Sequence, residues 1–152
     1  MMKNQKTINA LLFLFFTCVL LSKHIYAATI NFGPNGCTLQ DAIRSANDDA
    51  PRGNCAAGSG YDTLISPDVW SITLNSRLPT ITSDMTIRTT TASGSLTLSG
   101  DATTRIMKIT GANTDVTLER VVFENGFGNS NVAGAIQIES ANVTLNTTLF
   151  FS

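Results

Sequence analysis

The sequence repeats a short aliphatic-threonine-aliphatic triplet, and this repeat constrains the fold more than any other feature. The triplet occurs as Met85-Thr86-Ile87, Leu96-Thr97-Leu98, Val116-Thr117-Leu118 and Val143-Thr144-Leu145. Because side chains alternate between the two faces of a strand, each triplet turns its aliphatic residues to one face and its threonine to the other. Each triplet therefore predicts a short strand that is buried on one face only.

The last two triplets begin a longer internal repeat. The ten residues from Val116 align with the ten from Val143, an offset of 143 − 116 = 27 residues. Met85, Leu96 and Met107 also recur every 11 residues. A period of the longer kind is typical of solenoids, and the short strands are separated by Gly, Asn, Asp and Ser turns. We predict an all-β chain, a right-handed parallel β-helix of about three to four coils over residues 62–152.

Residues 38–47 follow a helical period instead. The apolar residues Leu39, Ala42, Ile43 and Ala46 fall at i, i+3, i+4 and i+7 and form one face. Thr38 is placed to act as the N-cap of this helix. The first coil of a β-helix leaves its apolar interior and a strand edge exposed. We predict that the amphipathic helix covers this end, as part of a cap over residues 29–61.

The first 28 residues have the pattern of a secretory signal peptide. Lys3 and Lys6 precede an apolar run at 11–21, and Tyr26-Ala27-Ala28 supplies small residues for cleavage. The run is shorter than the about 20 residues that cross a bilayer, which favours cleavage over a single-pass anchor. We expect the mature chain to begin at Ala28 or Thr29, without a membrane span, and to be secreted or exposed at the outer surface.

Cleavage would change the charge and remove the histidine. Three of the four lysines and His24 lie in the signal, so Lys108 and six arginines face eleven acidic residues, a net charge of 7 − 11 = −4. This balance argues against nucleic-acid and anionic-membrane partners, which need basic patches. The loss of His24 excludes a histidine-dependent nucleophilic site or a His-ligated zinc in the mature chain.

The same cleavage would leave two of the three cysteines. Cys18 lies within the apolar run, whereas Cys37 and Cys55 flank the predicted helix. An even number of cysteines in an oxidising compartment favours a disulfide, with two free buried thiols as the alternative. Closing this loop would stabilise the fold by about 3 kcal/mol on the loop-entropy argument.

One cluster of charged side chains could serve carbohydrate chemistry. If Val121, Phe123, Ile136 and Ile138 face inward, Glu124 and Glu139 face outward, and we expect them on neighbouring strands with Arg120 close by. A polysaccharide lyase or hydrolase needs such clustered acids. An ordinary solvated face with a weak ion pair explains the same residues. We therefore treat Arg120, Glu124 and Glu139 as candidate ligand-binding residues and assign no catalytic residue.

Aromatic and acidic residues elsewhere offer further candidates. Phe127 lies in a glycine-rich turn and could stack on a sugar ring, whereas packing near the helix explains Tyr61 and Trp70 at least as well. Asp48, Asp49, Asp62 and Asp68 lack the spacing of a calcium loop, so we predict no metal and no cofactor.

The order of several short motifs resembles a known family. The segment Cys37-Thr-Leu-Gln-Asp-Ala-Ile43 is followed by Ala-Asn at 46–47, Asp-Thr-Leu-Ile at 62–65, Ile-Thr-Leu at 72–74, Leu-Pro-Thr-Ile at 78–81 and Leu-Thr-Leu-Ser-Gly at 96–100. Together they resemble the bacterial exported proteins marked by a Cys-Ser-Leu-Arg-Glu-Ala motif (CSLREA). In this chain Thr-Leu-Gln-Asp replaces Ser-Leu-Arg-Glu at 38–41, and Ala-Gly-Ala at 133–135 replaces a glycine-rich triplet.

The resemblance implies a signal peptide followed by right-handed β-helix repeats, displayed at the surface and without assigned catalysis. With it, the residues predict a non-enzymatic exported protein, a stalk or adhesin-type segment whose polar outer face contacts glycans or other cells. The alternatives are a fragment of a β-helix carbohydrate-active enzyme and a nonfunctional truncated remnant, since the coils stop at 149–152 without a closing helix. The residues predict no particular oligomeric state.

Overall fold

The structure is a computed structural model that describes residues 26–67, 69–128 and 133–151. The predicted signal therefore lies outside the described residues, apart from 26–28. In chain order the elements are β1 (Thr29–Asn31), α2 (Leu39–Asp48), β2 (Asp62–Ser66), β3 (Val69–Thr73), β4 (Met85–Thr89), β5 (Ser95–Ser99), β6 (Met107–Thr110), β7 (Asp115–Glu119), β8 (Val121–Glu124), β9 (Ile136–Glu139), β10 (Asn142–Asn146) and β11 (Leu149–Phe151).

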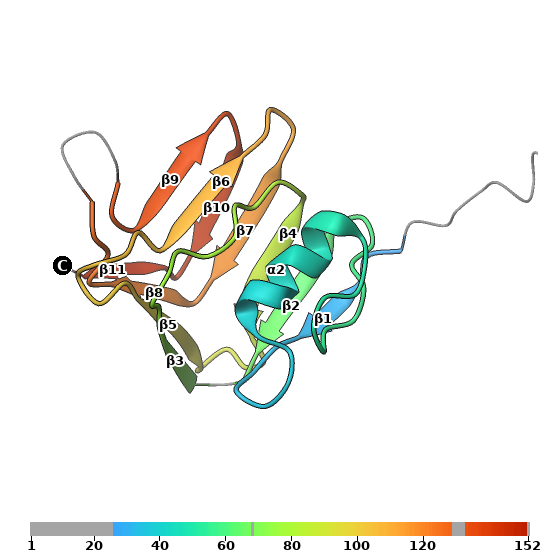
Figure 1. Cartoon of the computed structure of the whole chain (residues 1–152), viewed down its shortest axis with the longest axis horizontal. Coiled ribbons are helices and arrows are strands. Elements are labelled where there is room, and N and C mark those ends of the chain that lie inside the picture. Colours follow the sequence, from blue (N-terminus) through green and yellow to red (C-terminus); the bar gives the residue numbers. More distant parts are fainter. Residues whose placement is uncertain (1–25, 68, 129–132, 152) are drawn as a thin grey trace, which may run out of the picture.

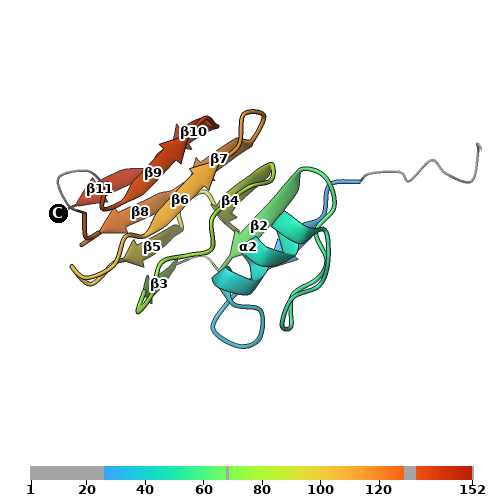
Figure 2. The same cartoon turned by 45° about the horizontal axis from the view of Figure 1, so that its top comes forward.

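The strands form three parallel sheets that surround one interior. The first sheet has the order β1-β2-β4-β7-β10, the second β11-β8-β5-β3, and the third pairs β6 with β9. Every pairing between named strands is parallel, and successive coils stack along one axis (Figures 1 and 2). The fold is thus a parallel β-helix of about three turns with one short helix, and the predicted fold class is confirmed.

The strand register confirms the 27-residue repeat and explains the shorter one. Val143 lies opposite Val116, an offset of 143 − 116 = 27. Met85, Leu96 and Met107 lie on β4, β5 and β6, one in each sheet, and all three are fully buried. The 11-residue spacing is therefore the step from one face of a coil to the next, not the length of a coil.

The interior is built from columns of aligned apolar side chains. Leu98, Phe123 and Phe150 occupy one such column on β5, β8 and β11. The rings of Phe123 and Phe150 are stacked with their centroids 5.3 Å apart and their planes inclined by 12°. Fully burying one large apolar side chain stabilises a fold by about 1.5–3 kcal/mol, so these columns carry most of the stability of the coil.

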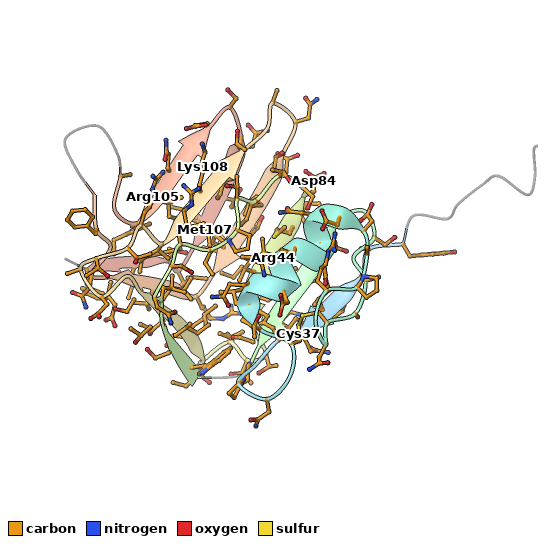
Figure 3. The ribbon with its side chains drawn as sticks, viewed as in Figure 1. Cys37, Arg44, Asp84, Arg105, Met107 and Lys108 are labelled. Atoms are coloured by element: carbon orange, nitrogen blue, oxygen red, sulfur yellow. A yellow bond between two sulfur atoms is a disulfide. The ribbon has the colours of Figure 1, made fainter. Side chains whose placement is uncertain are left out.

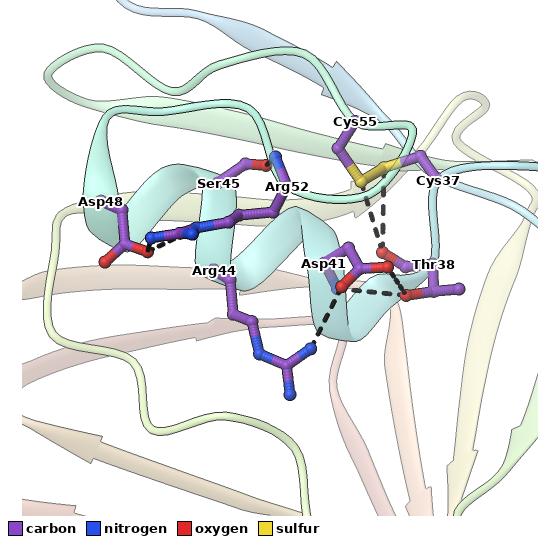
Figure 4. Close-up of polar contacts among 8 residues, drawn as sticks. All are labelled: Cys37, Thr38, Asp41, Arg44, Ser45, Asp48, Arg52 and Cys55. Atoms are coloured by element: carbon purple, nitrogen blue, oxygen red, sulfur yellow. Dashed lines mark hydrogen bonds and ion pairs between the residues drawn. A yellow bond between two sulfur atoms is a disulfide. The ribbon is translucent and has the colours of Figure 1, made fainter.

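Helix α2 covers the end of the solenoid formed by β1 and β2 (Figures 1 and 2). Its apolar face of Leu39, Ala42, Ile43 and Ala46 is buried, as predicted. The hydroxyl of Thr38 accepts the Asp41 N–H at 3.1 Å, which supplies the predicted N-cap (Figure 4). The helix spans residues 39–48, one residue later at each end than the predicted range.

A disulfide joins Cys37, just before α2, to Cys55 in the loop after it (Figure 4). The two Cα atoms are 4.6 Å apart, and both residues are buried. The predicted disulfide is confirmed, and the alternative of two free thiols is not what the structure shows. The bond closes a loop that contains the whole helix, so it holds the cap in one piece.

The opposite end of the solenoid is open. Apolar side chains of the last coil are substantially exposed there, with Leu149 at 51% and Phe151 at 58% of their accessible area. Figure 2 places β9, β10 and β11 at this end, away from α2. Among the described residues, no helix is long and apolar enough to cross a membrane.

Candidate functional site

Glu124 and Glu139 do not lie on neighbouring strands, and that expectation is wrong. Glu124 is on β8 opposite Ser99 and Phe151 in the second sheet. Glu139 is on β9 opposite Thr110 in the third sheet. Their outward orientation follows from strand alternation, but each coil has three faces and the two acids occupy different ones.

Arg120 lies at the corner between β7 and β8, in the left-handed backbone region with φ = 56°. Its Nε donates to the Thr89 hydroxyl at 3.1 Å, and its guanidinium lies 3.6 Å from a carboxylate oxygen of Glu119. The structure pairs Arg120 with its own neighbour in sequence rather than with Glu124 or Glu139. Its polar groups therefore help to hold the corner.

Glu139 belongs to a different polar group, on the outer face of the third sheet. The Lys108 ammonium lies 2.9 Å from Glu139 Oε2, and Gln137 Nε2 donates to Glu139 Oε1 at 2.6 Å. Lys108 stands directly opposite Gln137 across β6 and β9. Figure 3 labels Lys108 and Arg105 beside β6. We call Arg105, Lys108, Gln137 and Glu139 the β6–β9 face.

Two buried polar atoms of the β6–β9 face have no hydrogen-bond partner within the described residues: Arg105 Nε, a donor, and Gln137 Oε1, an acceptor. A buried polar atom without a partner costs about 1–3 kcal/mol, and such atoms are normally satisfied. A ligand that both donates and accepts hydrogen bonds could satisfy both. The β6–β9 face is therefore chemically incomplete in a way that Glu124 and Arg120 are not.

Phe127 lies near the start of β6. Its side chain is 53% exposed, and its backbone N–H donates to the Thr104 carbonyl at 3.0 Å, one residue before Arg105. The turn that carries it is tightly packed, since a Cβ on Gly126 would lie 2.5 Å from the Gly134 carbonyl oxygen. The fold thus brings an exposed aromatic ring to the region of the β6–β9 face.

The other two aromatic candidates have structural partners. Trp70 packs against Phe32 with ring centroids 6.0 Å apart, so its role is in the interior near the cap. Tyr61 is 40% exposed, and its hydroxyl lies 3.4 Å from the hydroxyls of Thr86 and Thr117. Tyr61 therefore lies across the threonine row on the outside of the first sheet, rather than under the helix.

The aspartates considered as calcium ligands are not assembled into a site. Within the described residues, no group of three or more His, Cys, Asp or Glu side chains could hold a metal ion. Asp48 accepts a hydrogen bond from Arg52 Nε at 2.8 Å, and Asp62 is fully buried. Asp68 lies outside the described residues.

Comparison of the chain with protein-family models, with curated proteins and with solved structures finds no match. The class of protein that the structure defines is a parallel β-solenoid with a disulfide-closed helical cap. The resemblance to CSLREA proteins stays a prediction from the residues.

Sequence reasoning found Glu139 and Phe127 but missed Arg105, Lys108 and Gln137. A signal for two of them exists in the sequence. Met107-Lys108-Ile109 and Ile136-Gln137-Ile138 have the same alternation as the threonine triplets, with a polar residue at the centre, at an offset of 136 − 107 = 29. Stacking these two strands places Lys108 against Gln137.

Proposed function

We propose that this chain is an exported, non-enzymatic β-helical surface protein that contacts glycans through the β6–β9 face. The observation that carries the proposal is the pair of unpartnered buried polar atoms, Arg105 Nε and Gln137 Oε1, beside an ion pair. Sugar hydroxyls both donate and accept hydrogen bonds, which matches one unused donor and one unused acceptor. Export rests on the signal pattern of residues 1–28 and on the CSLREA-like order of motifs.

The form of the solenoid supports a role in display. The strands pair in register from coil to coil, and a disulfide closes the cap. Side chains on such a scaffold are held on strands rather than loops, so they present fixed geometry to a ligand. Phe127, exposed close to Arg105, offers the flat apolar surface on which sugar rings stack.

A binding role fits the acids better than a hydrolytic one. Glycosidases place two carboxyl groups about 5–9.5 Å apart across the bond that is cleaved. Here the two candidate glutamates lie on different sheets, and Glu139 is already paired with Lys108. The enzyme-fragment alternative would have to use other acids, so we propose binding without cleavage.

The proposal is tested by measuring retention of the purified protein on immobilised neutral and uronate-containing polysaccharides. We expect retention on at least one of them, reduced about tenfold by Gln137→Ala, which removes roughly one hydrogen bond to a charged or polar ligand. Phe127→Ala should also weaken it. Thr97→Ala, on the outer face of the second sheet, is the matched control and should bind normally.

Thermal unfolding of all variants keeps binding separate from folding. Binding that is equal in the Gln137→Ala, Phe127→Ala and Thr97→Ala proteins would contradict the assignment to the β6–β9 face. Absence of retention on every glycan would contradict the glycan-binding function itself. Release of shortened glycan products would favour the enzyme alternative.

A further inference from the structure

The most unusual group in the described residues is the carboxyl of Asp62, at the start of β2. Asp62 is 0% exposed. Its Oδ1 accepts the Ser59 N–H at 2.8 Å and the Ala28 N–H at 3.1 Å, whereas its Oδ2 is buried without a partner. A buried carboxylate normally has a cation or a full set of hydrogen bonds, because its charge loses hydration.

The surroundings of Asp62 make the missing cation more costly. A Cβ on Gly58 would lie 2.5 Å from Asp62 Oδ2 and 2.6 Å from the Ser45 carbonyl oxygen, so the carboxyl is enclosed between the loop and α2. Burial raises the pKa of Asp62, and the nearby charge of Asp49 at the end of α2 raises it further, against the opposing effect of the two N–H bonds. None of the ion pairs among the described residues involves Asp62.

The hydrogen bond from Ala28 places this carboxyl at the predicted processing site. Cleavage of the bond between Ala27 and Ala28 by an endopeptidase consumes one water molecule. The Ala27 carbonyl carbon takes the hydroxyl and leaves as a carboxylate with residues 1–27, and the Ala28 nitrogen becomes a primary amine. Such an amine has an ordinary pKa of about 7.7–8.0, so it is largely an ammonium at neutral pH.

We propose that the chain is processed between Ala27 and Ala28, and that the new α-ammonium of Ala28 binds the buried carboxylate of Asp62. This inference rests on the proposed export. The atom that becomes charged already lies 3.1 Å from Asp62 Oδ1, and an ammonium has three N–H donors where the peptide has one. The additional donors can serve Oδ2, and the positive charge supplies the counterion.

The geometry selects Ala28 over Thr29 as the first residue. A chain that began at Thr29 would lose the Ala28 donor to Asp62. It would also lose the Ala28 carbonyl, which accepts the Thr63 N–H at 2.8 Å and begins the pairing of β1 with β2. Processing at Ala28 keeps both bonds, so the ion pair fastens β1 onto the first coil beneath the cap.

The first experiment maps the N-terminus of the full chain after export from a bacterium, by intact mass and N-terminal sequencing. Ala28 as first residue is the expected result. A mature chain that begins elsewhere would overturn the inference while leaving export intact. A chain that is neither exported nor cleaved would overturn both.

The second experiment measures the coupling between the amine and Asp62 in the processed protein. The Ala28 amine is acetylated selectively, and urea unfolding is compared for the original protein and for Asp62→Asn. We expect acetylation to lower the folding equilibrium constant about tenfold or more with Asp62 and to change it little in Asp62→Asn. Asp101→Asn, at an exposed turn where asparagine fits the positive φ, is the matched control and should respond like the original protein.

A measurement on the original protein covers the case in which Asp62→Asn does not fold. The pKa of the Ala28 amine, followed by NMR of the labelled residue, should lie above its ordinary range by about one unit or more. A chain extended by Ala27, which moves the ammonium one residue away, should show an ordinary value. The ion pair would be refuted by an unshifted amine pKa in the Ala28 protein, or by an effect of acetylation that is equal in the original protein and in the Asp62→Asn variant.

Discussion

Truncating two stacked phenylalanines should have unequal effects, because only one of them lies in a closed part of the interior. Phe123 is 0% exposed between Leu98 and Phe150, whereas Phe150 is 50% exposed at the open end. Phe123→Ala should cost about 3–5 kcal/mol of unfolding free energy, the usual range for a buried Phe. Phe150→Ala loses about half as much burial and should cost roughly 1.5–2.5 kcal/mol.

The contact between the rings adds a coupling that can be measured. Stacked aromatic pairs contribute about 0.5–1.5 kcal/mol beyond burial, so the double variant should cost less than the sum of the singles by that amount. Urea unfolding followed by far-UV circular dichroism measures all three. Phe123→Leu, expected to cost about 1 kcal/mol, keeps the comparison usable if Phe123→Ala unfolds.

The result that would refute this reasoning is an equal cost for Phe123→Ala and Phe150→Ala. Equal costs would mean that Phe150 is as well buried in solution as Phe123, and that something covers the last coil. Light scattering over a range of protein concentrations would then show whether a second copy of the chain provides that cover.

Three further predictions concern the cap and its buried acid. Replacing both Cys37 and Cys55 by serine should lower the unfolding free energy by about 3 kcal/mol, measured by urea unfolding, with reduced original protein as the comparison; an unchanged midpoint would show that the closed loop does not stabilise the cap. Thr38→Ala should cost about 1 kcal/mol and lower helicity while Thr38→Ser costs little, because serine keeps the cap oxygen that accepts the Asp41 N–H. In the unprocessed chain the folded pKa of Asp62 lies above its ordinary 3.8, so stability should be greatest below that value and fall as pH rises through the folded pKa; thermal unfolding from pH 3 upward should show this fall and Asp62→Asn should lack it.

Much of the fold follows from short-range pattern, since strand alternation and helix capping depend on residues close together in the chain. The triplets at Leu96 and Val116 alternate over three residues, and each lies on a half-buried strand as predicted. Thr38 and the apolar face that begins at Leu39 define α2 to within one residue. The offset of 27 between Val116 and Val143 even predicts which residues stack, because identical coil lengths keep the same register.

The candidate site required the path of the chain around each coil. Alternation alone placed Glu124 and Glu139 outward, but the chain passes from β8 to another sheet at β9, where Glu139 meets Lys108. Coil lengths also vary, from 85 − 62 = 23 residues between β2 and β4 to 116 − 85 = 31 between β4 and β7, because the turns absorb the difference. A single period read from the sequence could not assign those partners.

The sequence therefore specifies the local elements of this protein, the repeat and the pairing of Cys37 with Cys55 across a short loop. Stacking of coils decides the rest, because parallel pairing brings together residues that are one turn of the solenoid apart in the chain. Ala28 meets the buried carboxyl of Asp62 across 34 residues, and Lys108 meets Glu139 across 139 − 108 = 31. Each contact depends on the lengths of the turns and on the exclusion of water from the closed interior, neither of which a local pattern contains.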